Sequence, residues 1–230
     1  MKWQVIWSDF VDLLFPRCCE ACDTDLVGNE QLLCTSCRVS LPRVGPDSLY
    51  ADQAANRFVH LPAVGSVQAF LLFAKRGKVQ RLLHALKYRG ARDLGLEVGR
   101  WFGHEMSAQE NFPSVQLIVS VPLHDRKRRR RGYNQSDLLA EGISLATGIP
   151  WSGGLLKRTK YTETQTGKDK WARRENVRGV FEVAKRLDFE ELMLVDDVLT
   201  TGATLEACVE VLVSAGAKVI HIRTLALAQH

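Results

Sequence analysis

The chain has 230 residues, of which 46% are hydrophobic and 25% are charged, and its 31 Lys and Arg against 26 Asp and Glu give a formal net charge of +5. This length and composition suit one α/β domain with a small appendage. They exclude an integral membrane protein, because no apolar stretch in the sequence is long enough to cross a bilayer.

The first segment has the pattern of an amphipathic helix. Asp9 and Asp12 interrupt its apolar run, so it does not resemble a secretory signal peptide, and we expect a cytoplasmic protein whose thiols stay reduced. We expect the apolar face to pack against the rest of the chain or a partner, without membrane insertion. Its residues are Trp3, Ile6, Trp7, Phe10, Leu13 and Leu14.

Two CxxC pairs follow, Cys19 with Cys22 and Cys34 with Cys37, separated by a polar loop. Each CxxC turn can point two sulfurs at one ion, and four thiolates close a tetrahedral shell with no open position. A segment this short cannot bury a core of its own, so a bound metal would supply the missing stability. The spacing therefore predicts a structural Zn²⁺ site.

Disulfide pairing and a redox role are the alternatives for these cysteines, and both fit poorly with a reducing compartment. Cys18 adjoins the first pair and could compete as a ligand, although its spacing to Cys22 is less regular. Cys208 lies on a predicted helix and is most simply a buried apolar residue.

The middle of the chain alternates apolar runs with helical patterns, as expected of a mostly parallel sheet flanked by helices. We predict strands over Val64–Phe73 and Leu117–Val121, and helices over Val79–Tyr88 and Ser136–Leu145.

The segment His124–Arg131 carries six Lys and Arg residues between a predicted strand and a predicted helix. We predict that it forms a loop and holds an anionic group. A solvated basic loop without a ligand is one alternative. A nucleic-acid patch is another, but the one nearby aromatic residue, Tyr133, makes a poor stacking platform.

The segment Arg158–Lys168, followed by Lys170, Arg173, Arg174 and Asn176, has little apolar periodicity and many side-chain donors. Inside a folded domain such a segment often forms a mobile lid, which here would be cationic and could close over a ligand. An ordinary surface loop is the alternative that composition supports equally.

The most informative stretch joins a strand to a helix near the end of the chain. Leu192–Val195 is an apolar run of strand length, and Leu205–Val213 has helical spacing, so the polar residues between them are predicted to lie in the connecting turn. Ligands of open α/β sheets bind at such turns. A last strand is predicted over Val219–Ala226.

The turn Thr200–Thr204 offers hydroxyls and unobstructed backbone N–H groups at a helix N-terminus, which suit a 5'-phosphate. Asp196 and Asp197 would repel the phosphate, but they can accept hydrogen bonds from a nearby sugar diol. The turn is not a P-loop, because no lysine follows Gly202. An acidic helix cap is the alternative.

At this point the sequence resembles known proteins. Val195–Thr204 is similar to the motif of the type I phosphoribosyltransferases that binds 5-phosphoribosyl-1-pyrophosphate (PRPP). Over almost the whole chain the order of motifs resembles the ComF family, also called GntX or double zinc ribbon plus phosphoribosyltransferase proteins. Arg128 and Lys168 stand where family members usually carry leucine, which affects the packing of their two segments.

The matching motifs are, in chain order, Phe15-Pro16 before Cys19 and Cys22; Cys34 and Cys37; Leu86-Lys87-Tyr88-Arg89-Gly90; Val121-Pro122-Leu123-His124 leading to Arg131-Gly132-Tyr133-Asn134-Gln135; Arg158, Thr162 and Gln165; Arg173, Asn176 and Val177; and Asp196-Asp197 with Thr200-Thr201-Gly202.

The resemblance implies an α/β fold of the type I phosphoribosyltransferase class over residues 46–230, with an N-terminal helix and zinc module over residues 1–45. It implies transfer of the 5-phosphoribosyl group from PRPP to an unidentified nitrogen acceptor, with Mg²⁺ bound alongside PRPP and pyrophosphate released. Asp196 and Asp197 would be catalytic and would hold the ribose. The implied PRPP-binding residues are Asp196, Asp197, Thr200, Thr201, Gly202, Ala203, Thr204, Arg126, Arg129, Arg131, Arg158 and Lys160.

The resemblance also suggests partners. Members of the family are linked to DNA uptake during natural competence, in the cytoplasm beside a helicase-like protein, and a homodimer is compatible with the sequence. Two alternatives to an enzyme follow: a PRPP or nucleotide sensor that binds without turnover, and a single-stranded DNA-binding accessory of the uptake machinery.

Overall fold

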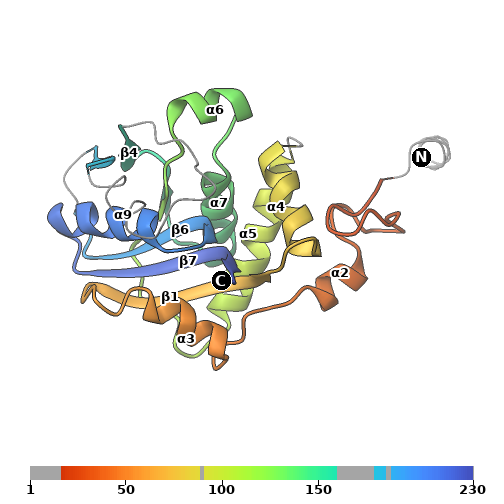
Figure 1. The fold of residues 1–230 in the computed structure, drawn as a ribbon, viewed down its shortest axis with the longest axis horizontal. Coiled ribbons are helices and arrows are strands. Elements are labelled where there is room, and N and C mark those ends of the chain that lie inside the picture. The colour runs from red at the N-terminus through yellow and green to blue at the C-terminus, as the bar shows by residue number, and fades with distance from the viewer. Residues whose placement is uncertain (1–16, 89–90, 160–178, 185–187, 230) are drawn as a thin grey trace.

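A parallel β-sheet forms the centre of the protein (Figure 1). The structure is a computed structural model, and it describes residues 17–88, 91–159, 179–184 and 188–229. Within these residues the sheet has five strands in the order β1-β7-β6-β2-β3, and a separate antiparallel pair joins β4 to β5. The strands are β1 (Val64–Phe73), β2 (Leu117–Ser120), β3 (Trp151–Ser152), β4 (Leu156–Arg158), β5 (Phe181–Val183), β6 (Glu191–Leu199) and β7 (Val219–Ala228).

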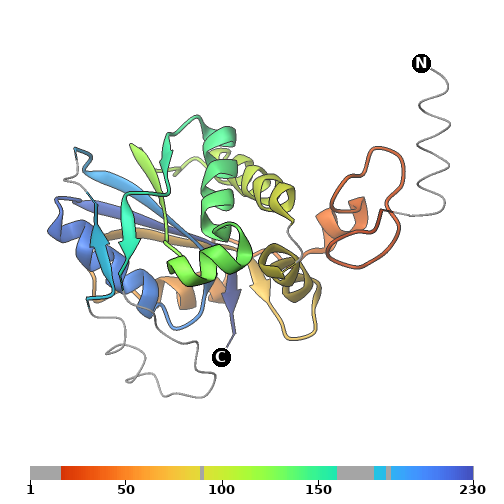
Figure 2. The ribbon, with the colours of Figure 1, turned by 90° about the horizontal axis from the view of Figure 1, so that it is seen from above.

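Helices cover both faces of this sheet (Figure 2). On one face α4, α5 and α7 form a core with Met193 and Val195 of β6. On the other face α3, α9 and the β4–β5 pair pack against Leu192 and Leu194. The helices are α2 (Thr35–Ser40), α3 (Leu49–Asn56), α4 (Lys78–Tyr88), α5 (Arg92–Ser107), α6 (Asp125–Arg131), α7 (Gln135–Thr147) and α9 (Ala203–Ser214).

The direction of the chain across the sheet reverses between β2 and β6. From β2 the chain moves outward to β3, then returns to β6 on the other side of β2 and continues to β7. The carboxyl ends of β2 and β6 are neighbours, because Ser120 pairs with Val195 in the parallel register. Open α/β sheets bind their ligands beyond the strand ends at such a switch point.

Residues 17–45 form a small module beside α4 and α5 (Figure 1). Its buried residues Cys19, Leu33 and Leu41 belong to the same core cluster as the leucines of α4 and α5. Arg38 of the module forms an ion pair with Glu97 of α5 at 2.7 Å. The domain boundary expected near residue 45 stays a prediction, since one core extends across it.

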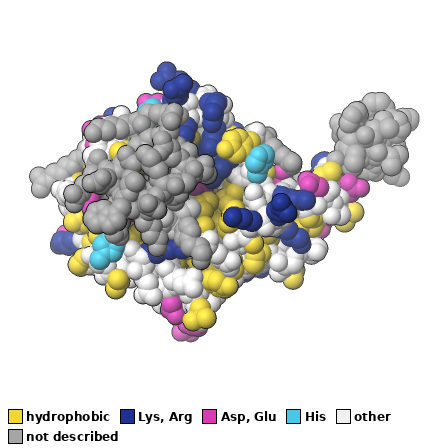
Figure 3. Space-filling view, viewed as in Figure 1, with side chains coloured by type: hydrophobic (Ala, Val, Ile, Leu, Met, Phe, Trp, Pro, Cys, Tyr) yellow, Lys and Arg dark blue, Asp and Glu magenta, His cyan; other side chains and the backbone are white. Residues whose placement is uncertain are grey.

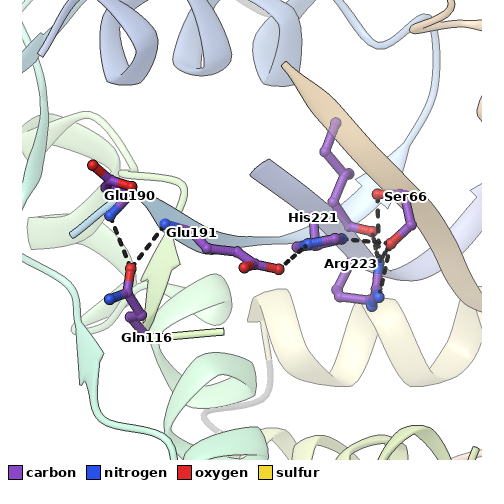
Figure 4. Close-up of polar contacts among 7 residues, drawn as sticks. Ser66, Gln116, Glu190, Glu191, His221 and Arg223 are labelled. Atoms are coloured by element: carbon purple, nitrogen blue, oxygen red, sulfur yellow. Dashed lines mark hydrogen bonds and ion pairs between the residues drawn. The ribbon is translucent and has the colours of Figure 1, made fainter. Parts of the chain in front are cut away.

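A buried polar network joins β1, β7 and β6 near the amino ends of these strands (Figure 4). His221 Nδ1 lies 2.8 Å from Ser66 Oγ, and its Nε2 lies 2.9 Å from Glu191 Oε1. Arg223 donates two hydrogen bonds of 3.0 Å to Ser66 Oγ, and burial lowers its pKa to about 10. Gln116 Oε1 accepts the backbone N–H of Glu191 at 3.0 Å. These bonds hold the register of β1, β7 and β6 near the amino ends of the strands, away from the switch point.

The predicted strands and helices are present and differ from the structure mainly at their ends. The strand Val64–Phe73 has these bounds in the structure, and the other three predicted strands correspond to β2, β6 and β7. The three predicted helices of the domain correspond to α4, α7 and α9. The predicted N-terminal helix and the proposed lid from residue 160 to 178 lie outside the described residues. None of the described helices is long and apolar enough to cross a membrane.

One prediction of local structure was wrong, because the basic run forms the helix α6 and not a loop. The His124 side chain accepts a hydrogen bond from the Arg126 backbone N–H at 3.1 Å, which caps the start of the helix. Gly132 ends it in the left-handed region, with φ of 81°. The two caps offset the repulsion among the arginines between them.

Candidate active site

Asp196 and Asp197 lie inside β6 at the switch point, and not in the turn after it as predicted. The strand continues to Leu199, so both acids belong to the sheet and not to the turn. Both side chains reach helices of the face that carries α4 and α7, since Asp197 contacts Lys87 of α4 and Asp196 contacts Ser136 of α7. Each carboxylate therefore has its own set of partners.

Asp196 is held by two hydrogen-bond donors. Ser136 Oγ, in the first turn of α7, donates at 2.9 Å, and the Asp197 backbone N–H also donates at 2.9 Å. Burial raises the pKa of Asp196 to about 7, and the adjacent charge of Asp197 adds to the rise. A carboxyl group that titrates near neutral pH is characteristic of functional sites.

Asp197 forms an ion pair with Lys87, whose Nζ lies 2.7 Å from Asp197 Oδ2. Lys87 stands at the carboxyl end of α4, and both side chains are mostly buried. Burial by itself lowers the pKa of Lys87, but the carboxylates of Asp197 and Asp196 outweigh it and raise the pKa overall. Lys87 lies in the motif Leu86-Lys87-Tyr88-Arg89-Gly90, but it is not among the site residues predicted from the sequence.

The turn after β6 is shaped by Gly202, the N-cap of α9, which has φ of 89°. A Cβ atom at this position would lie 3.1 Å from the Phe58 ring. Gly202 thus passes closely over a buried aromatic side chain before α9 begins. Binding of an anion by the backbone N–H groups at the start of α9 stays a prediction.

Arg57 fixes the same turn from the end of α3. Its guanidinium donates to the carbonyl oxygens of Leu199, at 3.3 Å, and Thr200, and to that of Ala228 at 3.1 Å. One side chain therefore ties the ends of β6 and β7 to the turn. Its spacing from the turn in the sequence gives no signal from which this role could be predicted.

Basic side chains approach the acid pair from α6 and β4. Lys127 and Arg131 share one face of α6, being four residues apart. Burial lowers the pKa of Lys127, and the positive charges of Arg158 and Arg131 add to the effect, which indicates that the three cations lie close together. Arg131 Nε and Gln135 Nε2 are buried without a hydrogen-bond partner among the described residues. Such orphaned donors suit an anionic ligand.

The other predicted basic residues are arranged differently. Arg126 and Arg129 are exposed on α6, as are Arg128 and Arg130. Figure 3 shows Lys and Arg side chains standing out at the top of the molecule, where Figure 1 places α6. Lys160 lies outside the described residues. Helical geometry thus divides the basic run into an inward pair and an outward group, which a loop prediction could not do.

A cavity of about 510 Å³ adjoins this site between α6, the start of α7 and β4. Asp137 lines it, and its Oδ1 accepts hydrogen bonds from Ser120 Oγ at 2.6 Å and Asn134 Nδ2 at 2.7 Å. Burial raises the pKa of Asp137. Arg158 borders both this cavity and the neighbourhood of Asp196.

The four predicted zinc ligands come together in the N-terminal module. The Sγ atoms of Cys19, Cys22, Cys34 and Cys37 all lie within 4.8 Å of one another, and those of Cys22 and Cys34 are 3.7 Å apart. Tetrahedral zinc with Zn–S bonds of about 2.3 Å needs sulfurs about 3.8 Å apart. The thiol set therefore fits a closed zinc site, and Cys18 is exposed and outside it.

The chain is similar to known proteins. Residues 120–230 match the phosphoribosyl transferase domain family. The DNA utilization protein YhgH of Salmonella typhimurium is 27% identical over 224 residues, covering 91% of this chain and 96% of that protein. YhgH of Escherichia coli O157:H7 is 31% identical over 144 residues, covering 61% of this chain and 63% of the relative.

Two further proteins are similar to part of the chain. Competence protein F of Haemophilus influenzae is 38% identical over 116 residues, covering 49% of this chain and 51% of that protein. Among solved structures, the glutamine PRPP amidotransferase of B. subtilis in complex with ADP and GMP aligns with a TM-score of 0.38 and 25% identity. That alignment covers 56% of this chain and 26% of the other.

Proposed function

The chain belongs to the ComF family, which combines a phosphoribosyltransferase domain with an N-terminal four-cysteine cluster, and on this premise we propose that it binds PRPP and transfers its phosphoribosyl group. The acceptor is a nitrogen nucleophile, and pyrophosphate is the leaving group. The observation that carries the proposal is the acid pair at the end of β6, next to a turn held by Arg57 and a cluster of half-buried cations.

Each part of PRPP has a complementary group in this arrangement. The 5'-phosphate would occupy the turn Thr200–Thr204, including the N–H groups of Ala203 and Thr204, and Asp196 and Asp197 would accept hydrogen bonds from the ribose hydroxyls. Arg131 and Arg158 would hold the pyrophosphate. Lys127 would contact the pyrophosphate as well, because Arg131 and Arg158 lie close enough to lower its pKa. Arg126, Arg129 and Lys160 remain proposed pyrophosphate ligands.

The reaction needs no covalent nucleophile. Cleavage of the bond to pyrophosphate ahead of attack builds positive charge on the ribose ring and negative charge on the leaving group. Asp196 and Asp197 would stabilise the positive charge on the ribose ring. The cations of α6 and β4 would stabilise the negative charge on pyrophosphate. Asp197 already forms an ion pair with Lys87. Mg²⁺ would therefore bind together with PRPP and not beforehand at the acid pair. When bound, Mg²⁺ offsets the charge of pyrophosphate.

Calorimetric titration with PRPP and Mg²⁺ tests the proposal directly. We expect Asp196→Asn and Asp197→Asn each to weaken binding by about tenfold or more, since each removes a charge-assisted hydrogen bond to the ribose. Asp188→Asn, an exposed change shortly before β6, is the matched control and should bind as the wild type does. Unchanged affinity in both site variants would remove the ribose assignment. Binding without pyrophosphate release across a panel of acceptors would identify a sensor.

Single-stranded DNA binding is a second candidate, favoured by one specific observation. Besides the half-buried Lys127 and Arg131, α6 carries four exposed arginines, namely Arg126, Arg128, Arg129 and Arg130. Relatives of the chain carry the names DNA utilization protein and competence protein. Phosphate contacts from these side chains would give affinity without base specificity.

The salt dependence of DNA affinity distinguishes this candidate. We expect log Kd against log salt to have a slope of about 0.7 per phosphate contact, so that Arg128→Ala with Arg130→Ala lowers the slope by about 1.4. Lys218→Ala, on the surface beside Glu190, should leave the slope unchanged. Fluorescence anisotropy with a labelled oligonucleotide measures both. An identical slope in the double variant would exclude α6 as the DNA contact.

A further inference from the structure

Lys87 is positioned by contacts on both sides of it in α4. The hydroxyl of Tyr133 donates to the Leu86 carbonyl oxygen at 2.7 Å, and Tyr133 is buried. The guanidinium of Arg131 lies 5.4 Å from the centre of the Tyr88 ring. The carboxyl end of α4 is thereby attached to the segment between α6 and α7, and Lys87 is directed at Asp197.

This position lies between two regions of opposite charge. On one side are Asp197, whose Oδ2 is 2.7 Å from the Lys87 ammonium, and Asp196 next to it. On the other side is Arg131, which packs on the residue after Lys87. Lys127 belongs to the same cationic side, since the charge of Lys87 contributes to lowering its pKa. Lys87 therefore stands where the proposed ribose and pyrophosphate sites meet.

The ammonium group has more donors than the described residues use. A lysine carries three N–H donors, and Asp197 is its ion-pair partner among the described residues. If Lys87 only neutralised Asp197, its position beside the positive charges of Arg131 and Lys127 would be unfavourable. That proximity becomes favourable when an anion binds between the three cations.

We propose that Lys87 is a ligand of the pyrophosphate group of PRPP. This assignment rests on the proposed function. In the transfer, the bond between the ribose carbon and a pyrophosphate oxygen breaks, the oxygen keeps the electron pair, and the nitrogen acceptor forms the new bond. Lys87 would then donate to the oxygens that gain charge, while Asp197 stays beside the ring carbon that loses it.

Separate titrations with inorganic pyrophosphate and ribose 5-phosphate, at constant Mg²⁺, test this role. For Lys87→Met we expect pyrophosphate to bind about 10- to 100-fold more weakly, while ribose 5-phosphate changes by less than about threefold. A lysine that only held Asp197 in place would give the reverse pattern, because its loss would disturb the ribose end. Lys87→Arg should recover most of the pyrophosphate affinity, since the charge and donors remain.

The controls separate failure of this inference from failure of the proposed function. Lys75→Met removes the same charge at an exposed position just before α4 and should not alter either titration. If Lys87→Met does not fold, Lys87→Gln replaces it. Wild-type protein that fails to bind PRPP would reject the proposed function itself. Wild-type protein that binds PRPP, with a Lys87 variant of normal pyrophosphate affinity, would overturn the role of Lys87 alone.

Discussion

Removing zinc is expected to unfold the N-terminal module and to lower the melting temperature of the whole protein. Zinc modules of this size have apparent metal-binding free energies of about 10 to 16 kcal/mol, which exceed the stability that a short segment can gain from its own core. In residues 17–45 the helix α2 has only six residues. We therefore expect the module to depend on a cross-link formed by the four thiolates and one zinc ion.

The effect should spread beyond the module because its core is shared. Cys19, Cys37 and Leu41 are buried with the leucines of α4 and α5. Loss of the zinc site would expose the side of α4 and α5 that packs against the module. Lys87 lies at the carboxyl end of α4. PRPP affinity should therefore fall with zinc loss, through the displacement of α4 and Lys87.

Metal analysis and calorimetric unfolding check this result. We expect one zinc per chain in freshly purified, reduced protein, loss of that zinc in Cys37→Ser, and retention in Cys18→Ser. Cys18 is the matched control because it neighbours the cluster but is exposed and outside it. A zinc-to-protein ratio near zero in the wild type, or equal losses in the two variants, would contradict the assignment.

The sequence predicts the cysteine cluster well because it is a local pattern, in which CxxC spacing already brings two sulfurs to one ion. Asp196-Asp197 with Thr200–Thr204 are also contiguous in the chain, and their role stays a prediction. The structure adds that the strand continues through both acids and that each has a separate partner, Ser136 for Asp196 and Lys87 for Asp197. The local pattern does not indicate these partners.

Residues that reach the site from afar could not be found in this way. Arg57 contacts Thr200 across 143 positions, and Lys87 meets Asp197 through the packing of α4 on the sheet. Neither contact has a characteristic spacing. Their roles depend on tertiary structure, which single-sequence periodicity does not encode.

The helix α5 shows the opposite problem, in which local propensity is misleading. Gly95, Gly99 and Gly103 lower helix propensity, and no helix is predicted over this segment. In the structure they let α5 pack closely on α7, since a Cβ atom at Gly99 would lie 2.6 Å from the Leu139 carbonyl oxygen. Close packing places the first turn of α7, with Ser136, beside Asp196.

Gly202→Val is expected to abolish PRPP binding at accessible concentrations. The left-handed conformation at Gly202 disfavours a residue with a Cβ atom by about 1 to 2 kcal/mol, and the added atoms would overlap the Phe58 ring. The turn must then move away from Phe58 and from Arg57. Losing two backbone hydrogen bonds to the 5'-phosphate would weaken binding by about 100-fold or more.

Gly148→Val is the matched control for backbone strain. Gly148 ends α7 with φ of 75°, and a Cβ atom there would meet nothing within 4 Å. This variant should lose about 1 to 2 kcal/mol of stability and bind PRPP normally. Calorimetric titration and thermal unfolding of both variants separate the two effects. Normal PRPP affinity in Gly202→Val would exclude the turn as the phosphate site.

The two halves of PRPP make this prediction complementary to that for Lys87. Gly202→Val disturbs the phosphate turn and should weaken ribose 5-phosphate strongly, while pyrophosphate binding changes little. Lys87→Met should do the reverse. Opposite patterns in the two variants would require separate subsites at the carboxyl end of β6, one formed by the turn and one by the cations of α4, α6 and β4. Parallel losses in both variants would instead indicate a general collapse of the site.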